Sequence, residues 1–345
     1  MKVKMKIVLA FFLLIISNIS HSESAPTLFD ANVIPHASVI SHEDCFSGVF
    51  SSYKSWKEEM VFGKGIKELA FQQRFPESDF NQYKDTVQCY SFVYEVEQHL
   101  VKGFVLYPKG LLNEKLPSII YNRGGNNVNS HTLKFGNLFF YHFPLALEGN
   151  VVISSQYGGA MVWPKNFKGN GGVDEYGGVE VKDVLALIPI LDSMPITDPN
   201  RIAMFGWSRG SMMSLIAVTK TNRIKTLVLG ATPVDLVLSA INRPSLEHDV
   251  FKRLIPGYEF DKLALLEERS AIYWPEKIPK DISILMLHGT NDERTSIVPV
   301  FKFADTMKSL GVNIELKEFP SGSHTLIESK VSVYRKVLSW FNEHL

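Results

Sequence analysis

The chain has 345 residues, with 36 basic side chains, 36 acidic side chains and two cysteines. A formal charge of zero offers no basic surplus for nucleic acid, so we expect no nucleic-acid partner. The charged fraction of 21% and the apolar fraction of 45% are those of an ordinary globular protein, which excludes a disordered or fibrous chain. This length can bury a large core, as one big domain or one domain with additions.

The first 22 residues have the pattern of a secretory signal peptide. Three lysines precede an apolar run at residues 7–16, and small polar residues follow up to Ser22. The run is short for a membrane span, and an uncleaved N-terminal anchor is the alternative. We expect cleavage after Ser22 and a periplasmic or secreted protein with no stable membrane span.

Both cysteines, Cys45 and Cys89, lie in the part that would be exported. In an oxidising compartment two cysteines most simply form one disulfide. Such a bond would tie the N-terminal segment to the main body of the protein. The alternative is a pair of buried free thiols.

An N-terminal extension is expected over residues 23–88. Residues 23–45 contain scattered prolines and polar side chains and indicate a loose lead-in. Residues 51–85 indicate mainly helical structure, with Trp56 as a packing residue. The main domain is then expected to cover residues 89–345.

The main domain begins with two segments, residues 89–97 and 99–107, that are rich in Val, Phe and Tyr with partial alternation. This composition predicts two paired strands. Further strands are then expected at residues 118–121, 151–154, 202–205, 226–229, 282–287 and 314–317. Helical spacing falls between or after them, at residues 181–191, 211–218, 300–307 and 334–345.

This alternation of strands and helices predicts an α/β fold, with a mostly parallel sheet covered by helices on both faces. The exception is a polar, helical stretch at residues 233–280, which prolines interrupt. It falls between two strands and is interpreted as an inserted lid. In such folds the functional residues gather at the carboxyl ends of the strands.

One of these strand ends carries a serine between two glycines. Residues 204–210 read M-F-G-W-S-R-G, so Ser208 lies between Gly206 and Gly210, directly after a predicted strand and before a predicted helix. In a G-x-S-x-G turn the hydroxyl stands above the sheet, and close backbone packing leaves no room for flanking Cβ atoms. The context therefore favours a nucleophilic serine.

A nucleophilic serine needs a base, and the base needs an orienting acid, which follow in the order Ser, acid, His in this type of fold. Asp292 follows the strand at residues 282–287, and the adjacent Glu293 is the alternative acid. His324 lies in the loop between the last strand and the last helix. Ser208, Asp292 and His324 together predict a catalytic triad.

The oxyanion formed during acyl transfer needs fixed N–H donors. One is the backbone N–H of Arg209, the residue after the nucleophile. The second is expected from the loop after an earlier strand, where the sequence reads N-R-G-G, with Arg123 and Gly124 as candidates. The exact donor in this loop stays open.

From about residue 90 to the end, the chain resembles the catalytic domain of the prolyl oligopeptidase family of serine peptidases, in the α/β-hydrolase superfamily. The matching stretches are I-I-Y-N-R-G-G, D-E-Y-G-G-V-E-V-K-D-V, D-P-N-R-I-A-M-F-G-W-S-R-G, L-M-L-H-G-T-N-D and S-G-S-H. The resemblance implies Ser208 as nucleophile, His324 as general base and Asp292 as its orienter. The sequence has no zinc H-E-x-x-H, no dinucleotide-binding G-x-G-x-x-G and no P-loop, so we expect no metal and no cofactor.

The chain also departs from this family. Ser211 stands where members usually have a second glycine, and Arg123 stands where many have a tyrosine or histidine. The residues between the predicted signal peptide and Cys89 are too few for the β-propeller of the well-studied peptidases.

We therefore expect a serine hydrolase that acts on a small peptide through an acyl-enzyme. A carboxylesterase and a non-catalytic binding protein are the alternatives. The oligomeric state is left open by the sequence.

Overall fold

The computed structural model of the protein describes residues 36–345, except residues 112, 127–131, 161–162 and 164–168. The predicted signal peptide, residues 1–22, lies outside the described residues.

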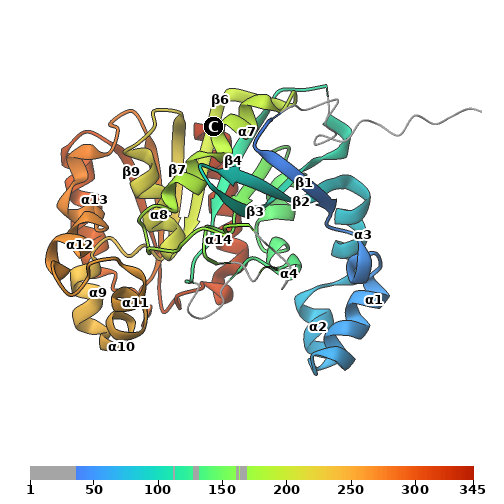
Figure 1. Cartoon of the computed structure of the whole chain (residues 1–345), viewed down its shortest axis with the longest axis horizontal. Helices are drawn as coiled ribbons and strands as arrows, with labels where there is room; N and C mark the ends of the chain where they lie inside the picture. Colours follow the sequence, from blue (N-terminus) through green and yellow to red (C-terminus); the bar gives the residue numbers. More distant parts are fainter. Residues whose placement is uncertain (1–35, 112, 127–131, 161–162, 164–168) are drawn as a thin grey trace, which may run out of the picture.

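A nine-stranded sheet lies at the centre of the described structure, in the order β1-β2-β3-β5-β4-β6-β7-β8-β9 (Figure 1). The pairs from β5 through β4 to β9 are parallel, whereas β1, β2, β3 and β5 pair antiparallel. The mostly parallel sheet is therefore as predicted. The strands are β1 (Val39–Asp44), β2 (Val87–Val96), β3 (His99–Pro108), β4 (Leu116–Asn122), β5 (Val151–Ser155), β6 (Thr197–Trp207), β7 (Ile224–Gly230), β8 (Ser283–Gly289) and β9 (Asn313–Phe319).

Two apolar clusters cover the two faces of the sheet. Successive strand residues point to opposite faces, so Ile119 and Ile120 of β4 belong to different clusters. One cluster packs on α6, α7, α8 and α13, and the other on α5 and α14. These helices and their short neighbours are η3 (Lys109–Leu111), α4 (Phe135–Leu138), α5 (His142–Leu147), α6 (Val181–Leu185), α7 (Leu187–Ser193), α8 (Arg209–Val218), α13 (Val298–Ser309), η7 (Ile327–Ser329) and α14 (Lys330–His344).

Residues 36–86, called the N-terminal region below, pack against the second of these faces. Trp56 is buried at its centre, with its ring 4.8 to 5.2 Å from the rings of Phe71, Phe75, Phe135 and Phe139. The region thus shares its core with α4 and the segment after it. Its elements are β1, η1 (Gly48–Phe50), α1 (Tyr53–Glu58), η2 (Glu59–Gly63), α2 (Glu68–Arg74) and α3 (Glu77–Thr86).

A disulfide joins Cys45, just after β1, to Cys89 in β2, with the two Cα atoms 5.4 Å apart. Of the expected loose lead-in at residues 23–45, residues 23–35 lie outside the described residues. The expectation is wrong for Val39–Asp44, which form β1 and pair with β2. Most side chains of β1 are exposed. The strand is therefore held by backbone pairing and has no apolar alternation for a sequence to display.

The predicted lid corresponds to a helical segment that follows β7 and lies at the opposite end of the molecule from α1 and α2 (Figure 1). The segment packs on the body through its buried apolar side chains, such as Phe251, whose ring lies 5.2 Å from that of Tyr176. The elements of the segment are α9 (Leu236–Asn242), α10 (Pro244–Leu246), η4 (Glu247–Phe251), α11 (Lys252–Leu254), α12 (Lys262–Glu268), η5 (Ala271–Tyr273) and η6 (Pro275–Lys277).

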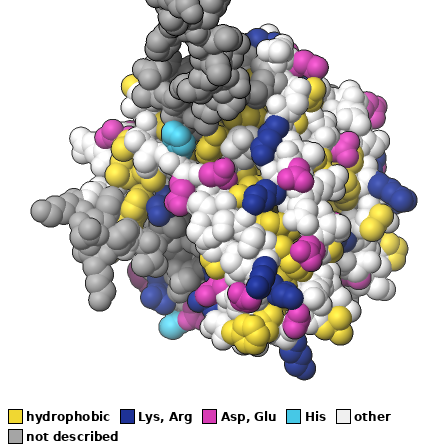
Figure 2. Space-filling model, turned by 90° about the vertical axis from the view of Figure 1, so that its right-hand side faces the viewer, with side chains coloured by type: hydrophobic (Ala, Val, Ile, Leu, Met, Phe, Trp, Pro, Cys, Tyr) yellow, Lys and Arg dark blue, Asp and Glu magenta, His cyan; other side chains and the backbone are white. Residues whose placement is uncertain are grey.

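The face in Figure 2, which is the right-hand side of Figure 1, carries acidic and basic side chains that are interspersed. None of the described helices is both long enough and apolar enough to cross a membrane.

Candidate active site

Ser208 lies where β6 ends and α8 begins, as the G-x-S-x-G pattern predicts. Its φ of 54° and ψ of −123° are outside the regions that residues with a side chain usually occupy. This backbone turns the chain sharply from strand to helix and presents the hydroxyl at the carboxyl edge of the sheet. The N–H of Ser208 donates to the carbonyl oxygen of Gly230 at 2.7 Å, which fixes the turn against β7.

The two glycines of the turn are required by close backbone approach. A Cβ on Gly210 would overlap the carbonyl oxygen of Asn122, and one on Gly206 would overlap the carbonyl group of Gly210. The departure at Ser211 is accommodated, because its buried hydroxyl lies 2.9 Å from the carbonyl oxygens of both Gly206 and Gly230. Ser211 thus ties the start of α8 to the ends of β6 and β7.

Asp292 and His324 meet at the same edge of the sheet. His324 Nδ1 lies 2.8 Å from Asp292 Oδ2 and 3.0 Å from Oδ1. The side chain of Asp292 is 1% exposed and that of His324 is 11% exposed, so water screens the pair weakly. Glu293, the alternative acid, is exposed. The structure therefore brings Asp292 to His324.

Asp292 is held as a carboxylate. Burial alone would raise the pKa of this group, but the hydrogen bond and charge of His324 and the N–H groups of Arg294 and Thr295 outweigh it and lower the pKa. These N–H groups donate to Oδ1 at 2.8 and 3.0 Å. An ionised Asp292 accepts a hydrogen bond from Nδ1, which leaves Nε2 of His324 as the basic nitrogen.

The loop that carries His324 reaches the turn at Ser208. Trp207 Nε1, one residue before the nucleophile, donates to the carbonyl oxygen of His324 at 3.0 Å. The strands β6, β8 and β9 are parallel and end at one edge of the sheet. Ser208, Asp292 and His324 are therefore presented by neighbouring loops.

Of the three candidates for the oxyanion site, the structure places Arg209 and Gly124 next to Ser208 and bonds the Arg123 side chain elsewhere. Arg209 is the first residue of α8, and such an N–H has no acceptor within its own helix. Gly124 lies against the nucleophile, because a Cβ on it would be 3.4 Å from the Ser208 Cβ. The side chain of Arg123 turns away, and its Nε and Nη2 donate to the carbonyl oxygen of Gln156 at 3.1 and 2.5 Å.

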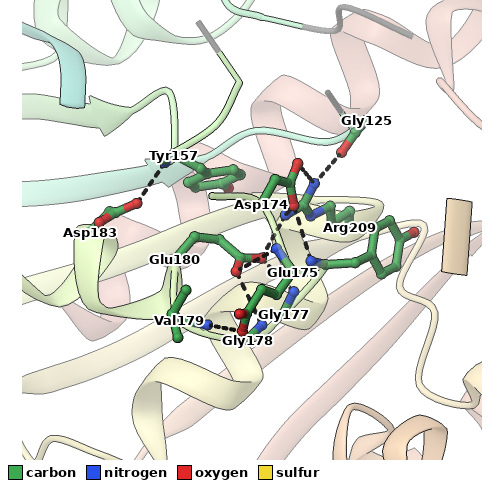
Figure 3. A network of polar contacts seen from close by, with 12 residues as sticks. Gly125, Tyr157, Asp174, Glu175, Gly177, Gly178, Val179, Glu180, Asp183 and Arg209 are labelled. Atoms are coloured by element: carbon green, nitrogen blue, oxygen red, sulfur yellow. Dashed lines mark hydrogen bonds and ion pairs between the residues drawn. The ribbon is translucent and has the colours of Figure 1, made fainter. Parts of the chain in front are cut away.

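A buried ion cluster behind the nucleophile was missed by the sequence reasoning (Figure 3). The Arg209 guanidinium donates to Asp174 at 2.5 and 2.9 Å and to Glu180 at 2.7 Å. It also donates to the carbonyl oxygen of Gly125 at 3.2 Å. Burial alone would lower the pKa of Arg209, but the two carboxylates raise it. The cluster thus joins α8, the loop after β4 and the turn before α6.

The sequence signal for this cluster is D-E-Y-G-G-V-E at residues 174–180, one of the stretches that resemble the prolyl oligopeptidase family. Glu180 also accepts backbone hydrogen bonds from Glu175, Gly177 and Gly178, at 3.2, 2.5 and 3.2 Å. It shapes the turn while pairing with Arg209.

A cavity of about 350 Å³ lies next to the loop of Asp292. It lies between α9 and the start of α13, and its lining includes Asp235, Arg243 and Asp292. The described part of the chain holds no group of three or more His, Cys, Asp or Glu side chains placed to bind a metal ion.

The sheet order and the serine turn together define an α/β-hydrolase fold. The acylaminoacyl peptidase of Pyrococcus horikoshii has the same fold, with a TM-score of 0.62 and 18% identity over 77% of this chain and 43% of its own. A puromycin-hydrolyzing peptidase of Mycobacterium tuberculosis gives a TM-score of 0.59 and 22% identity over 74% of this chain and 40% of its own.

The chain belongs to the prolyl oligopeptidase family, whose sequence profile matches residues 138–345, more than half of its length. The uncharacterized peptidase YuxL of Bacillus subtilis is 26% identical over 262 residues, which are 71% of this chain and 37% of YuxL. The uncharacterized peptidase YtmA of the same organism is 24% identical over 222 residues, 63% of this chain and 80% of YtmA. The chain thus spans less than half the length of YuxL and of the Pyrococcus enzyme.

Proposed function

We propose that the protein is an exported serine peptidase that cleaves peptide bonds through Ser208, His324 and Asp292. The observation that carries this proposal is the contact of His324 Nδ1 with both oxygens of Asp292, at 2.8 and 3.0 Å, in a loop bonded to the residue before Ser208. Membership of a peptidase family supports the choice of substrate class.

In the proposed reaction the Ser208 hydroxyl attacks the carbonyl carbon of the substrate while His324 Nε2 takes its proton. Asp292 holds the Nδ1–H and stabilises the imidazolium. The N–H of Arg209 and the loop at Gly124 face the oxyanion. The proton on Nε2 then passes to the leaving amine as the C–N bond breaks. A water molecule next attacks the acyl carbon while Nε2 takes its proton, and that proton returns to the Ser208 oxygen as the ester bond breaks.

The test is kcat/KM for two substrates that share one acyl group, an aryl ester and an aryl amide. We expect cleavage of both, lost in Ser208→Ala. Ester cleavage without amide cleavage would make the protein a carboxylesterase. If the wild type cleaves neither substrate and a fluorophosphonate does not label Ser208, the protein would instead be a non-catalytic binding protein.

The adjacent carboxylates of Asp292 and Glu293 offer a matched pair of variants. Asp292→Asn removes the charge that orients His324 and should lower kcat by about 10⁴-fold. Glu293→Gln makes the same chemical change at an exposed side chain and should stay within about twofold of wild type. The reverse result would move the orienting role to Glu293.

Export is proposed from the N-terminal sequence pattern, with the Cys45–Cys89 disulfide in support. The periplasmic or secreted protein should begin near Glu23 when its N-terminus is sequenced. A protein that keeps Met1 and stays in the cytoplasm would contradict this proposal.

A further inference from the structure

We propose that Trp207 is a positioning residue whose indole N–H holds the backbone of His324 in register with Ser208. This inference rests on the proposed hydrolase function. It assigns a role to the residue before the nucleophile, which neither the triad nor the oxyanion site explains.

The contact that carries the inference is direct. Trp207 Nε1 donates to the carbonyl oxygen of His324 at 3.0 Å. Trp207 is bonded covalently to Ser208, so this hydrogen bond joins the backbone of the nucleophile to that of the general base. Loss of this hydrogen bond would therefore change the position of the His324 backbone relative to that of Ser208.

The indole ring is fixed by its surroundings. Trp207 is buried, with 9% of its surface exposed. A Cβ on Gly230 of β7 would overlap the ring, so the ring lies directly on the backbone of the neighbouring strand. Tyr141 stacks on it, with ring centroids 5.9 Å apart and planes 22° from parallel. A ring held in this way gives its N–H one direction.

The other hydrogen bonds of the His324 loop, in the part of the chain that the structure describes, stay within the loop and its helix or lead to the loop of Asp292. Asn291 N donates to the Gly322 carbonyl oxygen at 3.0 Å, and Ser321 N donates to Thr290 Oγ1 at 2.8 Å. These contacts keep base and acid together. In the described sheet, β8 and β6 are joined only through β7, whereas the indole bond leads directly from the His324 loop to the residue before Ser208.

The expected consequence of losing the bond is a shift of His324 relative to Ser208 while His324 and Asp292 stay paired. A displacement of about 1 Å between reacting groups costs up to about 100-fold in rate. Substrate binding does not use this hydrogen bond, so the loss should fall on kcat and leave KM nearly unchanged.

The test uses Trp207→Phe, which keeps an aromatic ring and removes the N–H. Its matched control is Trp340→Phe. The indole of Trp340, in α14, is also buried and donates to Thr226 Oγ1 of β7 at 2.7 Å. We expect kcat for the aryl ester to fall about 10- to 100-fold in Trp207→Phe and less than twofold in Trp340→Phe. Equal losses in both variants would overturn the proposal.

A double-mutant cycle separates positioning from a general effect on the fold. In a His324→Ala background, Trp207→Phe should change the residual ester hydrolysis less than twofold, because its effect passes through His324. A full additional loss in that background would overturn the proposal.

Amide hydrogen exchange gives a readout that does not depend on activity. A peptide covering residues 320–326 should exchange faster in Trp207→Phe than in wild type or in Trp340→Phe. Unchanged exchange would overturn the proposed anchor. Activity that survives Ser208→Ala would instead refute the proposed function, and the exchange result would still decide the anchor.

Discussion

The loops around Ser208 and the N-terminal region are held in place by different kinds of contact. Around Ser208 backbone atoms approach one another so closely that Gly206 and Gly210 have no room for a Cβ, and the Trp207 ring fills the space beside Gly230. In the N-terminal region, packed aromatic rings centred on Trp56 and one disulfide hold the helices. Adding a single methyl group should therefore disrupt the loops around Ser208. In the N-terminal region, the loss of stability should instead increase with the size of the group that is removed.

The largest effect is expected for Gly210→Ala. The new Cβ would overlap the Asn122 carbonyl oxygen, which belongs to β4 and cannot move alone. We expect a loss of more than about 4 kcal/mol of unfolding free energy, measured by urea unfolding, and no measurable hydrolysis. Gly110→Ala is the control, because a Cβ there meets nothing within 4 Å. Similar stabilities for the two variants would contradict the claim that close backbone approach at Gly210 leaves no room for a Cβ.

Trp56→Ala tests the packing of the N-terminal region. The side chain is 2% exposed, and its removal should leave a cavity that costs about 3 to 4 kcal/mol. Phe62→Ala, at a side chain that is 83% exposed in the same region, should cost less than about 0.5 kcal/mol. Both values come from urea unfolding. Folded Trp56→Ala should keep the wild-type kcat, and a lowered kcat would show that the two regions are coupled.

The disulfide should contribute somewhat less. The double variant Cys45→Ala/Cys89→Ala should lose about 2 to 3 kcal/mol, because the bond closes a separation of 44 residues in the unfolded chain. Reductant should lower the stability of the wild type by a similar amount and leave the double variant unchanged. Mass spectrometry of unreduced, alkylated protein that finds both thiols modified would refute the bond.

The smallest effect concerns His142 of α5, whose buried ring lies 4.5 Å from the ring of Tyr121 in β4. Burial lowers the pKa of His142 to about 3, whereas the unfolded chain takes the proton near pH 6.5. Between these values the unfolded state binds one more proton, so stability falls as the pH falls below about 6.5. At pH 5 this group should cost about 2 kcal/mol relative to pH 7.

The matching variant is His142→Gln, which cannot take up a proton. Urea unfolding at pH 7 and pH 5 should show a smaller drop in the variant than in the wild type, by about 2 kcal/mol. His288, whose pKa burial also lowers, is present in both proteins and cancels in the difference. An equal drop in the two proteins would contradict a neutral, buried His142.

The sequence predicted the features that depend on local pattern and chain order. Alternating strands and helices gave the sheet, and the positions of Ser208, Asp292 and His324 at strand ends gave a candidate site whose members the structure places at one edge. The exposed strand β1 was missed, because edge pairing uses the backbone and leaves no apolar pattern.

Contacts of a side chain with a distant part of the chain could not be predicted from one sequence. The partners of Arg209 lie 29 and 35 residues away, and no local spacing connects them. The indole bond of Trp207 spans 117 residues. The direction of the Arg123 side chain likewise depends on Gln156, which the loop after β5 brings to it. Each of these depends on how the loops meet at the edge of the sheet.

The disulfide also has a consequence for proteolysis. Residues 46–88, with the exposed tip at Phe62, lie between the two bonded cysteines. A protease that cuts the chain near Phe62 would therefore leave two fragments still covalently attached. The nicked protein should migrate as one band without reductant and as two bands with it, and its core of parallel strands would keep both the proposed nucleophile and its base on the larger piece.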